Sequence, residues 1–123
     1  MANGKNYLKY GTVEMVVLFM LNKRDLYGYQ ISVYLDTMSG GDFVVNESTL
    51  YPTLYRMIDN KYISDRIENV GRRRTRVYYS ITDKGKERLH LILAEYSRTT
   101  AGIQKILSCD ALPDEKETGT DAK

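Results

Sequence analysis

NESTLYPTLYRMIDNKYISDRIENVGRRRTRVYYSIT, residues 46–82, combines one amphipathic helix with one basic β-hairpin. Asn46 is a good helix N-cap, and Glu47 places an acid in the first turn, where the helix dipole favours it. Apolar residues at helical spacing form the buried face of this helix: Leu50, Leu54, Met57 and Ile58. Pro52 removes a backbone hydrogen bond and conflicts with a helix. The apolar spacing nevertheless continues beyond it, so we predict a helix that ends at Asn60-Lys61.

The second half of this stretch predicts two antiparallel strands. Residues 62–70 and 75–82 alternate with a period of two, and Gly71-Arg72-Arg73-Arg74 joins them. The apolar positions of this alternation are Ile63, Ile67, Val77, Tyr79 and Ile81. Four arginines and no acid lie between Asn69 and Thr82, so the hairpin has a basic tip.

Two helices are predicted before this stretch. Residues 11–21, with Thr12 as a candidate N-cap, are apolar over most of the helix circumference. This helix must therefore be buried on two sides, either in the core or between the core and a second chain. Residues 27–38 form the second helix, which Ser39-Gly40-Gly41 ends. The short run Phe43-Val44-Val45 has the character of a strand.

One long helix is predicted after the hairpin. Thr82-Asp83 caps it, and it extends to about Leu107. Its apolar stripe contains Leu89, Ile92, Leu93, Tyr96, Ile103, Ile106 and Leu107. The acid-rich residues that follow are predicted to be disordered.

The composition excludes several classes of protein. With 123 residues, one domain is the expected number. One cysteine and one histidine cannot assemble a zinc site or an internal disulfide, and they leave no plausible catalytic constellation. We therefore predict no enzyme, no metal and no cofactor. No apolar run approaches the roughly 20 residues of a membrane span, and residues 1–6 do not begin a secretory signal, so we expect a cytoplasmic protein.

The charge is unevenly distributed along the chain. The net charge is +2, but residues 108–123 hold five acids against two lysines, which leaves an excess of cations on the remainder. A local basic cluster on a nearly neutral protein is typical of a nucleic-acid surface. Solvated surface loops are also basic, so composition alone leaves both interpretations open. Four like charges in one tight hairpin repel one another, which favours a polyanionic partner.

The order of the elements indicates a fold. Three helices followed by a β-hairpin predict a winged helix-turn-helix, mainly α with a small β-hairpin (α+β), plus a long C-terminal dimerisation helix. We expect residues 1–82 to form a winged-helix DNA-binding domain, residues 83–108 the dimerisation helix and residues 109–123 a disordered acidic tail. The third helix would lie in a major groove of DNA, and the arginine hairpin would reach phosphates or a minor groove.

Three blocks of sequence resemble the PadR family of bacterial transcriptional regulators. They are Leu26-Tyr27-Gly28-Tyr29-Gln30-Ile31, then Ser48-Thr49-Leu50-Tyr51-Pro52-Thr53-Leu54, then Gly71-Arg72-Arg73 with Tyr78-Tyr79-Ser80-Ile81-Thr82-Asp83-Lys84-Gly85. The blocks occur in the family's order and spacing, and the resemblance covers about residues 8–107. The single helix after the wing is similar to the compact branch of the family, and the family's third helix also contains the proline.

The resemblance implies a homodimeric winged-helix repressor of a stress, efflux or detoxification operon. Such a repressor is typically released from double-stranded operator DNA when a small, often aromatic, molecule binds. The resemblance also implies that the upstream region of the chain's own gene is a candidate operator.

Residues that touch DNA are expected on the third helix and the wing. The non-core positions of the helix are Asn46, Ser48, Thr49, Tyr51, Tyr55 and Arg56, placed toward its N-terminal end. Arg72, Arg73, Arg74 and Arg76 would each neutralise a phosphate. Tyr27 resembles a family position near the DNA backbone. The alternatives are that Asn46 is only a cap, that Tyr51 only packs, that Tyr27 belongs to the core and that the wing is a solvated turn.

The last helix predicts a dimer. It has little of its own domain to cover, so a second chain is expected against it. The predicted dimer interface comprises Val13, Val17, Leu89, Ile92, Leu93, Tyr96, Ile103 and Leu107. Two half-sites about one helical turn apart would then be read by the two third helices.

A candidate effector pocket lies at the same interface. In the multidrug-responsive branch of the family, a tryptophan of this helix stacks flat drugs between the subunits. This chain has no Trp, and Tyr96 stands in what resembles the matching place. Met15, Phe19, Ile92 and Leu93 are the other candidate lining residues, and Glu14 would favour a cationic guest. An apolar dimer interface needs no ligand to explain it, so this pocket remains one of two interpretations.

A rival function belongs to a different class of protein. The chain would then be a winged-helix protein-protein interaction module whose wing binds an acidic partner, without specific DNA binding. The dependence of duplex binding on salt separates the two, because phosphate contacts give a steep linear loss of log affinity with log salt.

Overall fold

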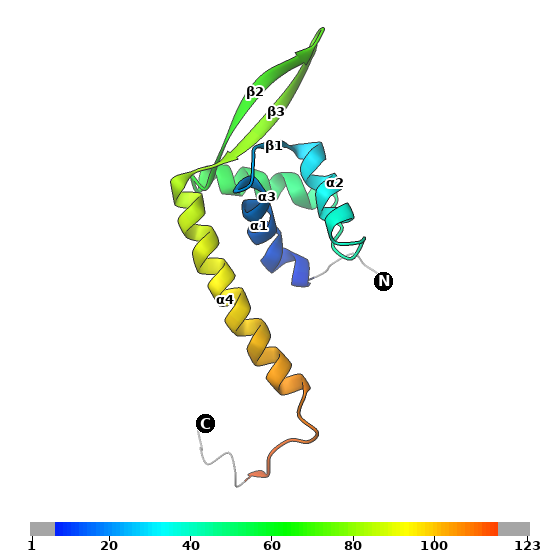
Figure 1. The fold of residues 1–123 in the computed structure, drawn as a ribbon, viewed down its shortest axis with the longest axis vertical. Helices are drawn as coiled ribbons and strands as arrows, with labels where there is room; N and C mark the ends of the chain where they lie inside the picture. The colour runs from blue at the N-terminus through cyan, green and yellow to red at the C-terminus, as the bar shows by residue number, and fades with distance from the viewer. Residues whose placement is uncertain (1–6, 116–123) are drawn as a thin grey trace. The chain divides into compact units, whose positions relative to one another are not determined.

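A computed structural model of the chain describes residues 7–115, with side chains described from residue 12. Four helices and one three-stranded sheet make up this part of the chain (Figure 1). The helices are α1 (Tyr7–Leu21), α2 (Gly28–Met38), α3 (Glu47–Asp59) and α4 (Asp83–Leu107). The strands are β1 (Leu26–Tyr27), β2 (Ile63–Gly71) and β3 (Arg74–Ile81). The predicted winged-helix class, mainly α with a β-hairpin, is therefore confirmed.

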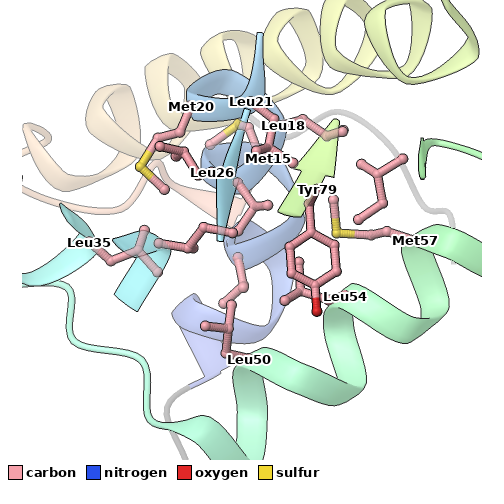
Figure 2. Close-up of a cluster of buried hydrophobic side chains, with 14 of the residues drawn as sticks. Met15, Leu18, Met20, Leu21, Leu26, Leu35, Leu50, Leu54, Met57 and Tyr79 are labelled. Carbon is pink, nitrogen blue, oxygen red and sulfur yellow. The ribbon is translucent and has the colours of Figure 1, made fainter. Parts of the chain in front are cut away.

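Helix α1 is the centre of the core. From Thr12 onward its side chains are buried on most of the circumference, which agrees with the apolar sequence around this part of the helix. It begins at Tyr7 rather than at Gly11, so Thr12 lies inside the helix and is not its N-cap. The core is completed by side chains from α2, α3, the sheet and the start of α4, including Ile31, Leu35, Leu50, Leu54, Met57, Ile63, Tyr79 and Leu89 (Figure 2).

The sheet has the order β1-β3-β2, and both pairings are antiparallel. The two-residue strand β1 was not predicted; it pairs Leu26 with Tyr79 and joins the hairpin to the start of α2. The predicted strand character of residues 43–45 is wrong, because this segment forms neither helix nor strand. Val45 is nevertheless buried, so its apolar character serves packing rather than pairing.

Only the base of the hairpin is covered by the core. Ile63 and Tyr79 are buried, whereas Ile67 is 72% exposed. Ile67 stands opposite Val77 in the register of β2 and β3, so these two residues cover each other across the strands. The predicted alternation is thus present, but its outer half extends beyond the body of the domain as a wing (Figure 1).

Helix α3 begins where the sequence predicts. The side chain of Asn46 accepts a hydrogen bond from the backbone N–H of Thr49 at 3.2 Å, the expected N-cap geometry. The helix continues through Pro52 to Asp59 without interruption. Pro52 is exposed and faces away from the core, whereas Leu50 and Leu54 of the same helix are buried in it.

Thr82 fixes the start of α4 against the end of α3 and the start of β2. Its hydroxyl accepts a hydrogen bond from the N–H of Gly85 at 3.0 Å and donates to the carbonyl oxygens of Lys61 and Tyr62. Gly85 lies so close to the Tyr62 carbonyl that a Cβ atom would collide with it. The wing and α4 therefore share one tightly packed junction.

The chain divides into two compact units, residues 1–93 and 94–123. The first turns of α4 belong to the first unit because Leu89 is part of its core, so this unit extends beyond the domain boundary that we expected after residue 82. Residues 109–114 form neither helix nor strand, and the remainder of the predicted tail, residues 116–123, lies outside the described residues. No helix in the described part of the chain is long and apolar enough to cross a membrane.

Candidate nucleic-acid interface

The N-terminal turn of α3 presents short polar side chains. Asn46 and Ser48 are exposed and Thr49 is half-buried. The Ser48 hydroxyl donates to the side-chain oxygen of Asn46 at 2.7 Å, and the same oxygen caps the helix through Thr49. Asn46 therefore has a structural role in holding the helix end. Ser48 and Thr49 remain the candidates for contact with base edges, for which this end of a recognition helix is suited.

Two tyrosines of α3 face the wing. The hydroxyl of Tyr51 lies against Gly28, where a Cβ atom would collide with it, so the glycine makes room for the tyrosine ring. Burial raises the pKa of Tyr51, and the nearby carboxylate of Glu47 raises it further. Tyr55 is exposed, with its ring centroid 6.5 Å from that of Tyr51. Tyr51 therefore packs against Gly28 and also lines the surface that faces the wing. It thus has both the packing role and the surface position that the sequence offered as alternatives.

Arg56 lies in the last turn of α3 rather than toward its N-terminal end. Its guanidinium donates to the hydroxyl of Thr53 at 3.3 Å. The expectation that it accompanies Ser48 and Thr49 at the N-terminal end is wrong, because two turns of helix separate them.

The wing carries its arginines at and just after the turn. Arg72 and Arg73 form the turn, and Arg74 pairs with Gly71. Arg73 has a φ of 58°, in the left-handed region that favours glycine, so a strained backbone position holds an arginine. Within residues 12–115, no carboxylate forms an ion pair with the four wing arginines. Their charge is thus available to a polyanion.

Arg76 and Tyr27 form one stacked unit. The guanidinium carbon of Arg76 lies 4.2 Å from the ring centroid of Tyr27. Tyr27 also meets Tyr78 edge-on, at 5.4 Å between centroids, and its backbone N–H donates to the side chain of Gln30. Tyr27 is half-buried. It therefore positions Arg76, the third residue of β3 after the turn of the wing.

A second arginine, which sequence reasoning missed, braces the wing. Arg66 of β2 forms ion pairs with Asp25 at 2.7 Å and with Glu68 at 2.6 Å, and it donates to the hydroxyl of Ser80. The hydrogen bond to Glu68 and then that to Asp25 raise the pKa of Arg66. Asp25 lies in the loop before β1, so the pair links the wing to the body of the domain. No local pattern could have identified this contact, because 41 residues separate its partners.

The wing, α3 and the start of α2 enclose one groove of about 560 Å³. We call it the tyrosine groove, and its lining residues are Tyr27, Gly28, Tyr29, Tyr51, Tyr55, Arg74, Arg76, Val77 and Tyr79. Five of the predicted DNA-contact residues meet in it: Tyr27, Tyr51, Tyr55, Arg74 and Arg76. Tyr29 and Tyr79 were not predicted, because no spacing in the sequence indicates that four separate elements, β1, α2, α3 and β3, bring tyrosines together.

Three residues of the predicted dimer interface are already covered by their own chain. Val13 and Val17 are 1% and 0% exposed, and Leu89 is also buried. A second chain cannot cover side chains that have no free surface, so the prediction for these three residues is wrong. Other apolar residues of α4 are exposed, among them Leu91, Leu93, Tyr96, Ile103, Ile106 and Leu107.

The candidate effector residues are only partly brought together. Phe19 and Leu93 line a cavity of about 200 Å³ with Asn22, Lys86, Leu89 and His90. Met15 belongs to the core and offers little surface to a ligand, which corrects its predicted role. Ile92 packs against the same core. Glu14 forms an ion pair with Arg88 at 2.9 Å, and Tyr96 belongs to the second compact unit.

Among the described residues, no group of three or more histidine, cysteine or carboxylate side chains is arranged to hold a metal ion. Cys109, the one cysteine of the chain, is exposed just after the end of α4. The arrangement of the described part of the chain is thus that of a binding surface, with cations and aromatic rings as its chemistry.

Known proteins are similar to this chain in both sequence and fold. Negative transcriptional regulator PadR of Bacillus subtilis (strain 168) is 31% identical over 78 residues, which cover 63% of this chain and 43% of that protein. A transcriptional regulator from Clostridium thermocellum has a similar structure, with a TM-score of 0.77, 29% identity, and coverage of 81% of this chain and 97% of that one. Bacillus subtilis PadR in complex with operator DNA gives a TM-score of 0.60 at 24% identity, with coverage of 84% and 51%, which is a likeness of fold.

Residues 17–91, more than half of the chain, match a single family of proteins. The match extends from the second half of α1 through the wing into α4, so it contains the tyrosine groove and the arginine wing. It also confirms that the chain is not an enzyme, since the family consists of regulators. The chain belongs to the transcriptional regulator PadR-like family.

Proposed function

We propose that this regulator binds double-stranded DNA through α3 and the wing. The observation that carries the proposal is the tyrosine groove, in which arginines of β3 and tyrosines of α3 line one surface. Arginines without carboxylate partners next to hydroxyl donors suit a phosphate backbone. The relative that was solved with operator DNA has the same fold, which supports a duplex as the partner.

Two parts of the surface have different tasks in this proposal. Ser48 and Thr49, at the exposed start of α3, contact base edges in the major groove and give the binding its sequence preference. Arg72, Arg73, Arg74 and Arg76 neutralise phosphates beside it and supply most of the affinity. The hydroxyl groups of Tyr51 and Tyr55 donate hydrogen bonds to the phosphate backbone of the DNA strand that lies between α3 and the wing. Arg56 contributes from the other end of α3.

We further propose that α4 joins two copies of the chain. Ile103 and Leu107 are one turn apart on α4, and both are exposed. Burial of each such side chain contributes about 1.5–3 kcal/mol, so a second copy that covers the stripe is strongly stabilised. A homodimer also presents two copies of α3, as two half-sites of an operator require.

The double variant I103E/L107E tests the dimer. Sedimentation is expected to give twice 14.2 kDa for the wild-type chain and 14.2 kDa for the variant, because buried carboxylates are strongly disfavoured. L112E is the matched control, since Leu112 is fully exposed after the end of α4. A variant that sediments like the wild type would contradict the role of α4 in the dimer.

Repression and release by an effector are the finer part of the proposal. The Bacillus subtilis relative is named a negative regulator, which supports repression. Such a repressor would act in the cytoplasm. The cavity beside Phe19 and Leu93 supports an aromatic effector, which would alter the spacing of the half-sites and so favour the DNA-free state. Flat aromatic compounds are expected to weaken the complex of protein and operator. Unchanged DNA affinity with every compound that binds the cavity would contradict this part.

A binding titration tests the central proposal. The upstream region of the chain's own gene is labelled as a duplex, and its fluorescence anisotropy is compared with that of a scrambled duplex of the same composition. K23Q serves as a control variant, because Lys23 is exposed in the turn after α1, outside the proposed surface. Absence of binding to both duplexes at low salt would favour the protein-protein interaction module instead.

A further inference from the structure

The tyrosine groove is large enough to hold a small ligand by itself. Its volume of about 560 Å³ lies within the range of roughly 300–1,000 Å³ that is usual for ligand pockets. Five tyrosines and two arginines line it, and no carboxylate does. Such a lining combines positive charge with several flat aromatic faces.

One part of the groove is suited to a phosphate. Arg74 and Arg76 are two residues apart on β3 and therefore share a face of the strand. The guanidinium carbon of Arg76 lies over the ring of Tyr27 at 4.2 Å from its centroid, so the ring holds the guanidinium beside the groove. A fixed guanidinium binds phosphate oxygens through two parallel hydrogen bonds.

The tyrosine hydroxyls add donors without adding charge. Burial raises the pKa of Tyr79 to about 12, and burial also raises the pKa of Tyr51. Both phenols therefore stay protonated and neutral at physiological pH. A bound anion meets a neutral hydrogen-bond donor from α3, Tyr51, as well as the cations of the wing.

The outer part of the groove is suited to an aromatic ring. Tyr29 is 68% exposed and Tyr55 is 58% exposed, although both are large aromatic residues. Nucleic-acid bases stack on exposed tyrosine rings with little regard to sequence, and a basic groove beside such rings binds the phosphate of the same nucleotide.

We propose that the tyrosine groove binds a single nucleotide, with its phosphate on Arg74 and Arg76 and its base stacked on Tyr55. The nucleotide is either free in solution or at an unpaired position of a strand, since both present the same chemistry. Because the same residues face duplex DNA in the proposed complex, a bound nucleotide competes with the duplex. The groove thereby gives the regulator a binding site for a nucleotide in addition to its binding surface for operator DNA.

Isothermal titration of the full chain tests this inference without any duplex. The probes are a nucleoside 5′-monophosphate, the nucleoside alone, inorganic phosphate and a short unpaired oligonucleotide. We expect saturable binding of the monophosphate, at least about tenfold tighter than that of the nucleoside or of phosphate, because only the monophosphate uses both parts of the groove. Equal binding of phosphate and monophosphate would overturn the proposal.

Variants of residues that line the groove locate the site. R76M and Y55A are each expected to weaken the monophosphate about tenfold, whereas Y55F retains the stacking ring and binds like the wild type. R98M, on α4 outside the groove, is the matched control for the loss of an arginine. Thermal unfolding verifies that each variant is folded. Affinities that R76M and Y55A leave unchanged would place the ligand elsewhere and contradict the inference.

The oligonucleotide identifies the source of the nucleotide. Binding of both the monophosphate and the oligonucleotide supports a site open to free nucleotides, and binding of the oligonucleotide alone supports a site for unpaired strands. Binding of neither overturns the inference. Duplex binding is measured separately, so a chain that binds duplex but no nucleotide refutes only this inference, and the reverse result refutes only the proposed function.

Discussion

The double variant R72Q/R73G is expected to bind operator DNA roughly a hundredfold to a thousandfold more weakly than the wild type at 0.15 M salt. It removes two charges from each wing and four from a dimer. Each lost phosphate contact lowers the slope of log affinity against log salt by about 0.9, so the slope should become shallower by about three to four. Glycine at position 73 keeps the turn intact, because the φ of 58° suits it.

The matched control removes the same charge elsewhere. K23Q/K61G also removes two cations, and Lys61 has a φ of 69°, so glycine fits its backbone as it fits that of Arg73. This control is expected to change affinity and slope far less, because neither lysine belongs to the wing. Equal losses in the two double variants would contradict a specific role of the wing and indicate a response to net charge alone.

Gly85→Ala is expected to have the largest effect on folding, a loss of about 3 kcal/mol in the free energy of unfolding. The new methyl group would collide with the carbonyl oxygen of Tyr62 and would lie 2.8 Å from a side-chain carbon of Ile81. The carbonyl is backbone and also accepts two hydrogen bonds from Thr82, at 3.0 Å from its N–H and 2.9 Å from its hydroxyl. It cannot move without separating α4 from the hairpin, and overpacking of this kind costs about 1–3 kcal/mol or more.

Urea unfolding followed by circular dichroism measures this loss. Gly102→Ala is the control on the same helix, because in the described part of the chain nothing beyond the neighbouring residues and backbone of α4 itself lies within 4 Å of its added methyl group. It should raise stability by about 0.5–1 kcal/mol through the helix propensity of alanine. Gly28→Ala is intermediate, since its methyl group meets the flexible end of the Tyr51 side chain. A stable Gly85→Ala variant would mean that the junction at Thr82 is looser than its contacts indicate.

Local signals in the sequence were sufficient for the order of the four helices and the hairpin. Asn46 and Thr82 cap helices where the pattern predicts, because capping depends on residues within one turn. The strand β1 was missed because two residues have no periodicity to detect. The run at residues 43–45 was misread because burial and pairing both favour apolar side chains.

The sequence predicted least well which apolar side chains are buried within their own chain and which are covered by a second chain. Helix α1 is apolar nearly all round, so periodicity could not tell whether Val13 and Val17 face their own core or a second chain. The core of the same chain covers both. The alternation in the hairpin likewise predicted which face of the sheet is apolar, but not how far the core covers that face. Ile67 lies beyond the covered part and is exposed.

The candidate site was predictable in its parts and not in its assembly. The basic tip of the wing and the polar start of α3 are each one continuous stretch of the sequence, so the composition of each stretch indicated it directly. The tyrosine groove depends on four elements meeting, β1, α2, α3 and β3, and the Arg66 brace joins residues 41 positions apart. Both arise from tertiary packing, for which a single sequence offers no local signal.

The affinity ratio between operator and scrambled duplex tests the central claim most directly. Genomic fragments that the full chain retains are selected, and the enriched sequence is then titrated by anisotropy beside its scrambled counterpart at 0.15 M salt. A sequence-specific regulator is expected to bind the enriched duplex at least about a thousandfold more tightly. Equal affinity for the two duplexes, or no enriched sequence at all, would contradict the claim that α3 and the wing read DNA.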